Sequence, residues 1–187
     1  MADVAFGFRP ISYAGPTRLC VIPASDGTAT FIGDAVKLHG SEDTTDNATT
    51  VIQAAAGNVI HGVIVGFVPD HSNLATKYRL ASTRRLCHVV PALPHIEFEV
   101  QADAAVTAGD SGTYYDMVVG TGSTTSGRSA MEIGISTAGA TGQLQLLRPS
   151  RTVDETFDTS AAGTNLVVAF NESSWKVYGG TAIAGNV

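Results

Sequence analysis

The chain has 187 residues, a formal net charge of −6 at pH 7 and a charged content of 15% against 44% hydrophobic residues. A chain of this length buries enough surface for one substantial core. Its negative charge argues against general nucleic-acid binding, because phosphates would be repelled by the average surface. No apolar run approaches the roughly 20 residues that a membrane-spanning helix needs. The 20 glycines and 7 prolines favour many turns and few long helices, which is typical of a β-rich protein.

Residues 1–14 are expected to form an extended arm, since Phe6 and Phe8 flank a glycine and Pro10 excludes a helix there. In an extended chain Phe6 and Phe8 would face one side and Arg9 the other. An apolar arm of this kind has little reason to be ordered alone. We therefore expect Phe6, Phe8, Arg9 and Pro10 to contact a partner protein or a neighbouring copy. The alternative is that both rings fold back to cap the chain's own barrel.

Short strands are predicted through the first half of the chain, from apolar–polar alternation bounded by glycine, proline and aspartate. They fall at residues 19–24, 29–33, 36–39, 51–55 and 59–68. The dipeptide Asp26-Gly27 predicts a hairpin between the first two of them. The stretch 71–85 fits a loop, a short helix or an irregular strand and is left unassigned.

The clearest strand signal is the stretch "IEFEVQ", with Ile96, Phe98 and Val100 on one face and Glu97 and Glu99 on the other, solvent-facing side. Further strands are predicted at residues 86–90, 114–120, 130–136, 143–148 and 165–170. The predicted core residues are Val36, Leu38, Ile64, Val65, Phe67, Ile96, Phe98, Val100, Leu144 and Leu146.

These elements predict an all-β fold, a compact β-barrel or β-sandwich that carries the extended arm and long loops. Residues 15–187 are expected to form a single β-rich domain that ends in a C-terminal extension at about 173–187. The segment 150–164 is a long polar connection, which inside a compact domain indicates a functional loop or an exposed arm.

No motif in the sequence supplies a catalytic or metal centre. The five histidines lie at no metal-ligand spacing, and neither a Gly-x-Ser-x-Gly elbow nor a glycine-rich loop leading into a helix is present. We therefore expect a protein that is not an enzyme, with no catalytic residue, no metal and no cofactor. The two cysteines, Cys20 and Cys87, are far apart in the sequence and match no motif, so we expect buried, reduced thiols in preference to a disulfide.

One stretch of the chain concentrates positive charge. It contains Lys77, Arg79, Arg84 and Arg85, four of the chain's 11 basic residues. Such a cluster predicts either a patch for an acidic surface of a partner protein or an ordinary solvated loop, and the sequence leaves both open.

Several segments, in this order, resemble a family of tailed-bacteriophage virion proteins. They are "FGFRPI", "FIGDAVKL", "AAAGNVIHGVIVGFVPD", "YRLASTRRLCHVV", "IEFEVQAD", "STTSGRSAMEI", "LQLLRPSRTVDE" and "NLVVAFNES". Members of that family are head structural proteins, several of them capsid decoration (cement) proteins. The resemblance runs from about residue 6 to residue 172 and leaves out the final "SSWKVYGGTAIAGNV".

The resemblance implies a non-catalytic virion protein that binds the outside of a tailed-phage capsid and stabilises the shell. It implies synthesis in the host bacterial cytoplasm and a final location on the capsid surface. The implied partners are the major capsid protein and other copies of the chain, a trimer being favoured over a dimer. No direct contact with nucleic acid or membrane is expected.

Two other functions stay open. The chain would be a glycan- or host-surface-binding module of the virion if its aromatic rings formed an exposed platform, for which the candidates are Tyr114, Tyr115, Trp175 and Tyr178. It would be a small hydrolase if the fold assembled aspartate, histidine and serine in one pocket.

Overall fold

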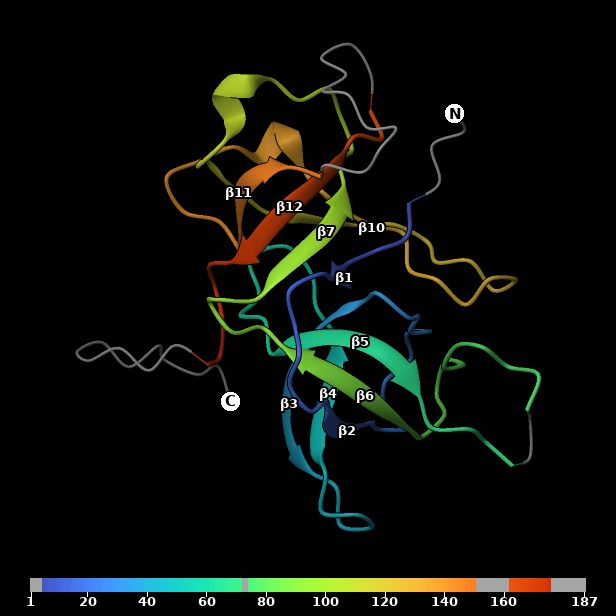
Figure 1. Ribbon diagram of the computed structural model, residues 1–187. Coiled ribbons are helices and arrows are strands. Elements are labelled where there is room, and N and C mark those ends of the chain that lie inside the picture. Colours follow the sequence, from blue (N-terminus) through green and yellow to red (C-terminus); the bar gives the residue numbers. More distant parts are fainter. Residues whose placement is uncertain (1–4, 72–73, 151–161, 176–187) are drawn as a thin grey trace.

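The computed structural model describes residues 5–71, 74–150 and 162–175, which fold into two stacked β lobes (Figure 1). One lobe is a closed five-stranded barrel, and the other combines a five-stranded sheet with a two-stranded sheet. The helical elements in this part of the chain are the 3-10 turns η1 (Ala108–Asp110) and η2 (Ile135–Thr137). Among the described residues, no helix has the length and apolar character needed to cross a membrane. The predicted all-β fold class is confirmed.

The barrel contains most strands of the first half of the chain. Its strands are β2 (Arg18–Ile22), β3 (Ala35–Glu42), β4 (Thr49–Gln53), β5 (Gly62–Phe67) and β6 (Arg85–Pro91). They follow one another around the barrel in the order β2, β4, β3, β5, β6, and β6 closes the barrel against β2. β2 runs parallel to β4, and the other neighbouring pairs are antiparallel. The interior is filled by Cys20, Ile22, Val36, Val51, Ile64, Cys87 and Val89.

The second lobe contains the later strands together with one strand from the N-terminal arm. Its larger sheet has the order β1, β7, β12, β11, β8, with every pair antiparallel. These strands are β1 (Arg9–Pro10), β7 (Glu97–Gln101), β8 (Tyr114–Tyr115), β11 (Leu144–Pro149) and β12 (Asn165–Phe170). The two-stranded sheet pairs β9 (Met117–Val119) with β10 (Met131–Ile133).

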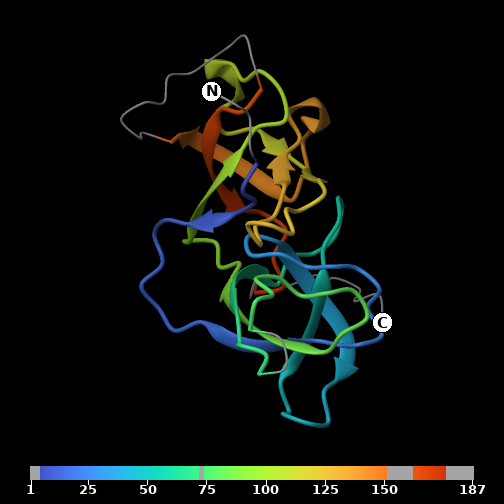
Figure 2. The ribbon, with the colours of Figure 1, turned by 90° about the vertical axis from the view of Figure 1, so that its right-hand side faces the viewer.

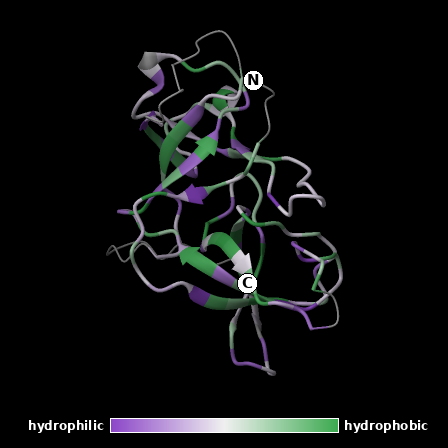
Figure 3. Ribbon diagram, turned by 45° about the vertical axis from the view of Figure 1, so that its right-hand side comes forward, coloured by the Kyte–Doolittle hydropathy of each residue, from purple (hydrophilic) through white to green (hydrophobic). Residues whose placement is uncertain are grey.

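The larger hydrophobic core lies in the second lobe and continues into the barrel wall. The barrel residues that join it include Ala35, Val63 and Val90, each next in sequence to a residue of the barrel interior. At these positions β3, β5 and β6 are buried on both faces, which explains runs such as "VIV" in β5 and "VV" in β6 in place of strict alternation. Figure 3 shows hydrophobic residues concentrated on the strands of both lobes.

Seven of the ten predicted core residues are buried. They are Val36, Ile64, Ile96, Phe98, Val100, Leu144 and Leu146. Val65 and Phe67 are half-buried, and the prediction for Leu38 is wrong, because 46% of it is exposed. The register of β3 against β4 shifts between Leu38 and Glu42, and this end of β3 runs beyond the barrel interior into the β3–β4 hairpin.

The predicted hairpin at Asp26-Gly27 is also wrong. β2 pairs with β4 and β6 instead of with residues 29–33, where Thr30 and Ile32 form isolated bridges to Arg79 and Arg128. The Asp26 turn curls around the buried side chain of Arg79, as described below, so it does not fold back onto β2.

The face assignment of Glu99 needs correction as well. Glu97 is half-buried, but Glu99 is 1% exposed, because β1 lies beside β7 with Arg9 opposite Glu99. The arm then crosses from β1 in the second lobe to β2 in the barrel (Figure 2). Of the predicted polar connection, residues 151–161 lie outside the described residues, and so does the predicted C-terminal extension from residue 176 onward.

Candidate interaction surfaces

The predicted contact residues of the arm begin with two phenylalanines, and one of them belongs to the interior. Phe8 is 2% exposed, and its ring centroid lies 5.2 Å from that of Phe170. Its backbone N–H donates to the carbonyl of Gly33 at 2.8 Å. The expectation that Phe8 contacts a partner is therefore corrected: this ring folds back onto the chain's own core.

Gly7 explains why the two phenylalanines separate. Its φ of +75° is a left-handed value that favours glycine, and it interrupts the extended alternation. A Cβ at Gly7 would lie 2.6 Å from the carbonyl oxygen of Gly33, so the close approach also requires glycine. Phe6 stays half-buried, with the guanidinium carbon of Arg9 5.3 Å from its ring centroid.

Arg9, another of the predicted contact residues, forms an ion pair with Glu99 of its own chain. The Glu99 side chain is 2% exposed, and it also accepts a hydrogen bond from the hydroxyl of Ser150. Pro10 lies opposite Phe98 in the β1–β7 pairing. The ion pair satisfies a buried carboxylate and fixes β1 on the sheet edge, so Arg9 has an internal role.

Arg79 is the second predicted contact residue that lies inside the molecule. It is 0% exposed, and its guanidinium donates to the carboxylate of Asp26 and to several backbone carbonyl oxygens. These carbonyls belong to Pro23, Asp26, Thr28 and Thr83. A planar guanidinium with five N–H donors suits this arrangement, in which two loops are tied together around one cation.

The other two arginines of the cluster are also used internally. Arg84 forms ion pairs with Asp43, at 2.7 Å, and with Asp46, in the β3–β4 hairpin. Arg85 donates to the carbonyl oxygens of Thr76 and Tyr78, and its guanidinium carbon lies 5.1 Å from the ring centroid of Phe67.

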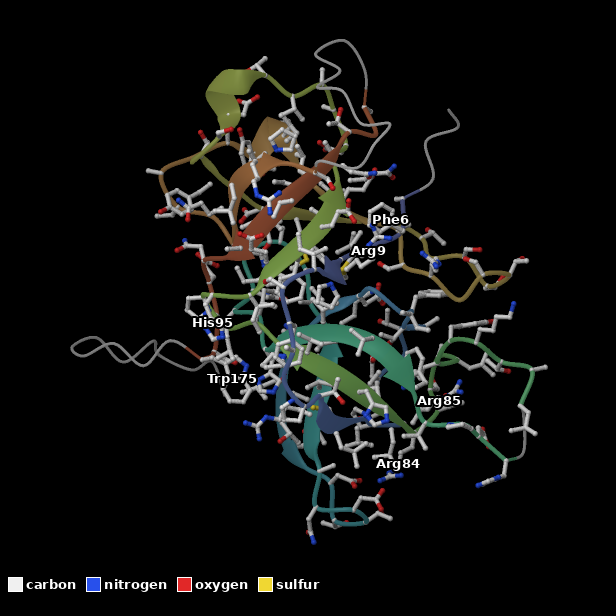
Figure 4. The ribbon with its side chains drawn as sticks, in the orientation of Figure 1. Phe6, Arg9, Arg84, Arg85, His95 and Trp175 are labelled. Atoms are coloured by element: carbon white, nitrogen blue, oxygen red, sulfur yellow. The ribbon has the colours of Figure 1, made fainter. Side chains whose placement is uncertain are left out.

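The predicted basic patch for an acidic partner is therefore not formed as a unit. Lys77 is exposed, and its ammonium donates to the carbonyl of Thr125 at 3.3 Å. Figure 4 places Arg84 and Arg85 on the barrel side, well separated from Phe6 and Arg9 on the second lobe. The predicted contact residues therefore do not form one surface: Phe8 and Arg79 are buried, and the others divide between the barrel and the second lobe.

The connection between β5 and β6 carries two exposed leucines that the sequence pattern did not single out. In residues 74–84, called here the 74–84 loop, Leu74 is 74% exposed and Leu80 41%. The loop is held in place by Arg79 and by the ring of Tyr78, which stacks on Phe31 at 4.9 Å between centroids. Figure 1 shows this connection reaching away from the barrel. The sequence signal is a pair of leucines that lie next to polar residues in the loop stretch "NLATKYRLAS".

A cavity of about 520 Å³ lies at the end of the barrel, between β3, β4 and the hairpin that joins them. Its lining includes Leu38, Ser41, Asp43 and Asn47. Arg84 donates hydrogen bonds to Asp43 and holds the pKa of that carboxyl below its ordinary value, which makes it a poor proton acceptor. Across the described residues, no group of three or more His, Cys, Asp or Glu side chains could hold a metal ion.

The aromatic candidates for glycan binding do not form one platform. Tyr115 is 0% exposed, and its hydroxyl donates to Asp110 at 3.0 Å. Trp175 is half-buried against His61, with ring centroids 4.9 Å apart, and its indole N–H donates to the His61 carbonyl at 2.6 Å. Tyr114 is half-buried in β8, and Tyr178 lies outside the described residues.

Among the described residues, His61 is the buried histidine. Its Nδ1 lies 3.0 Å from the hydroxyl oxygen of Ser174, and the ring is packed beneath Trp175. Burial, with a smaller contribution from the positive charge of Arg18, lowers the pKa of His61 to about 4. The ring is therefore neutral at pH 7 and contributes to attaching residues 174–175 to the barrel.

Among the predicted contact residues, the outer side of Phe6 and Arg9 and the side chain of Lys77 on the 74–84 loop remain accessible. Comparison with protein-family models, curated proteins and solved structures gives no significant match to this chain.

Proposed function

We propose that the protein is a non-catalytic structural component of a tailed-phage virion that binds the outside of the capsid and stabilises the shell. The resemblance of its segments to phage head proteins supports this role. The structural observation that carries the proposal is the 74% exposure of Leu74 on a loop that is fixed to the body by Arg79. A loop that is held in a fixed position and carries exposed apolar side chains can present them to another protein.

Preorganisation makes this loop suitable for binding. Because Arg79 and Tyr78 already hold the loop, little conformational entropy remains to be lost when Leu74 enters a groove of a partner. Leu80 and the ammonium of Lys77 are exposed on the same loop and supply further apolar area and one cation. A partner surface with an apolar groove beside an acidic group would match these side chains.

The proposed partners are the major capsid protein and neighbouring copies of this chain on the shell, a trimer being favoured over a dimer. A protein that binds only the assembled shell stabilises it by mass action. Each contact needs only modest affinity when many copies share one lattice.

Binding to undecorated heads tests the proposal. Purified protein is titrated onto heads that lack it, with bound copies counted after sedimentation and head stability followed by heating. We expect saturable binding and a higher disruption temperature, and binding about tenfold or more weaker for Leu74→Ser. Leu19→Ser is the matched control, since Leu19 is 47% exposed on β2 of the barrel. Failure of the folded wild-type protein to bind heads overturns the proposal. Equal binding of Leu74→Ser and Leu19→Ser would show that the 74–84 loop is not the contact site.

A further inference from the structure

The two cysteines, distant in the sequence, lie directly opposite each other in the fold. In the antiparallel pairing of β2 with β6, Cys20 is the partner of Cys87. Both are free, both are buried, and both belong to the cluster that fills the barrel interior. Residues directly opposite in an antiparallel pair share a face of the sheet, so the two thiols project to the same side.

The spacing of such a pair suits a disulfide. Directly opposed residues in antiparallel strands have Cα atoms about 4.5 or 5.5 Å apart, depending on the type of pair. Disulfides in proteins span Cα distances of about 4.4 to 6.8 Å. Either type of pair therefore falls within the range that a disulfide bridges without movement of the backbone.

The position of the pair gives such a bond a specific effect. β2 is the first strand of the barrel in the sequence and β6 the last, and their pairing is the seam that closes the barrel. A bond across this seam would prevent the barrel from opening there. It would also close a long loop of the unfolded chain, from residue 20 to residue 87, which disfavours the unfolded state.

We propose that Cys20 and Cys87 form an oxidisable dithiol whose disulfide locks the seam of the barrel. The inference does not depend on the proposed function. The oxidant is a low-molecular-weight disulfide such as oxidised glutathione. One cysteine thiolate attacks it, forming a mixed disulfide and releasing one glutathione thiolate; the other cysteine then attacks the protein sulfur and releases the second. Two protein thiols and one small disulfide thus yield one protein disulfide and two small thiols.

Both thiols are shielded from solution reagents in the closed barrel. Cys20 is 1% exposed and Cys87 0%, and burial raises the pKa of both thiols, that of Cys20 to about 11. Thiolate is therefore scarce in the folded state, and oxidation proceeds through opening of the seam or during folding. The dithiol is expected to persist in a reducing cytoplasm and to be converted in an oxidising medium.

A redox equilibrium tests the proposal, because refolding in the redox buffer exposes the thiols to the reagent before the barrel closes. Full-length protein is refolded from urea in mixtures of reduced and oxidised glutathione, then alkylated, and the bridged fraction is read by mass spectrometry. The same titration is run in concentrated urea. We expect the equilibrium constant for forming the Cys20–Cys87 bond to be about 100-fold larger in the folded protein than in urea. A ratio of one or less, or a folded protein that carries only mixed disulfides with glutathione, overturns the proposal.

A relocated pair is the matched control. The double variant Cys87→Val, Val89→Cys moves the second thiol two residues along β6 on the same face, so that it lies diagonal to Cys20. Diagonal neighbours are about 7–8 Å apart, beyond disulfide range. The equilibrium constant for forming the bond should therefore no longer be larger in the folded protein than in urea. If the double variant does not fold, the wild-type protein alone decides: its bridged form should melt roughly 5 °C or more above its reduced form, and an equal or lower melting temperature contradicts the inference.

Discussion

The guanidinium of Arg79 donates to the carboxylate of Asp26 across 3.1 Å, at a site where the arginine side chain has no exposed surface. This pair joins the loop after β2 to the 74–84 loop. Arg79→Met should therefore destabilise the protein by roughly 3 to 5 kcal/mol, because it leaves the Asp26 carboxylate and several inward-pointing carbonyls without their donor. Urea unfolding measures the change. Lys77→Met, at an exposed position on the same loop, is the control and should stay within about 0.5 kcal/mol.

The two phenylalanines of the arm should differ in their effect on stability. Phe8→Ala removes a ring that is packed 5.2 Å from Phe170 between centroids, and we expect a loss of about 3 kcal/mol. Phe6→Ala removes a half-buried ring that contacts Arg9, and we expect about 1 kcal/mol or less. Thermal unfolding of both variants gives the comparison. Equal effects would mean that the arm does not dock as described.

Truncating a side chain at the centre of the second lobe should cost more stability than truncating one at the end of the barrel. Phe98 is 0% exposed and packs edge-on against Phe170, with centroids 4.9 Å apart, so Phe98→Ala should cost roughly 3 to 5 kcal/mol. Leu38→Ala, at a position that is 46% exposed, should cost less than about 1 kcal/mol. Chemical denaturation measures the free energy of unfolding of both variants. A large loss of stability for Leu38→Ala would mean that Leu38 belongs to the core.

His61 predicts a particular dependence of stability on pH. Its folded-state pKa is lowered from 6.5 to about 4, so between these values the unfolded chain binds more protons than the folded one. Stability from this group is complete above pH 6.5 and is lost as the pH falls toward 4, by about 3 kcal/mol at most. Buried Asp34, whose pKa is raised by burial, acts in the opposite direction.

The difference in the free energy of unfolding between wild type and His61→Asn separates the effect of the histidine on pH dependence from that of the carboxyl groups. Unfolding free energies measured at several values between pH 7.5 and 4 should fall more steeply for the wild type than for the variant. Parallel curves would show that the ring titrates normally in the folded protein.

The parts of this fold that sequence predicted well are those governed by local alternation. Ile96, Phe98 and Val100 follow the strand period, and all three are buried. The same rule failed at Leu38, because alternation specifies a face of the strand but not how far the barrel interior extends along it.

The residues of the candidate surfaces were harder to predict because their surroundings come from distant parts of the chain. From the sequence, Arg79 is indistinguishable from a solvent-exposed basic residue of a loop. Only the fold brings the carbonyl groups of the loop after β2 next to its guanidinium. Phe8 is taken into the core by a left-handed glycine whose conformation the sequence permits but does not require. Leu74 and Leu80 have no periodicity, so no pattern separated them from their polar neighbours.

The pairing of β1 with β7 has a consequence for the order of events during translation. β1 leaves the ribosome first, but its partner strand begins at Glu97, and Phe8 packs on Phe170 near the end of the described chain. At about 5–20 residues per second, the arm waits on the order of ten seconds for β7 to be synthesised and longer for β12. The last strand of the barrel ends at Pro91, so the barrel can close while the chain between Pro91 and β12 is still being synthesised, which takes on the order of ten seconds at the same rate. The nascent chain therefore presents an apolar arm that still lacks the Phe170 ring beside a finished barrel, and this intermediate is the one that a ribosome-associated chaperone would meet.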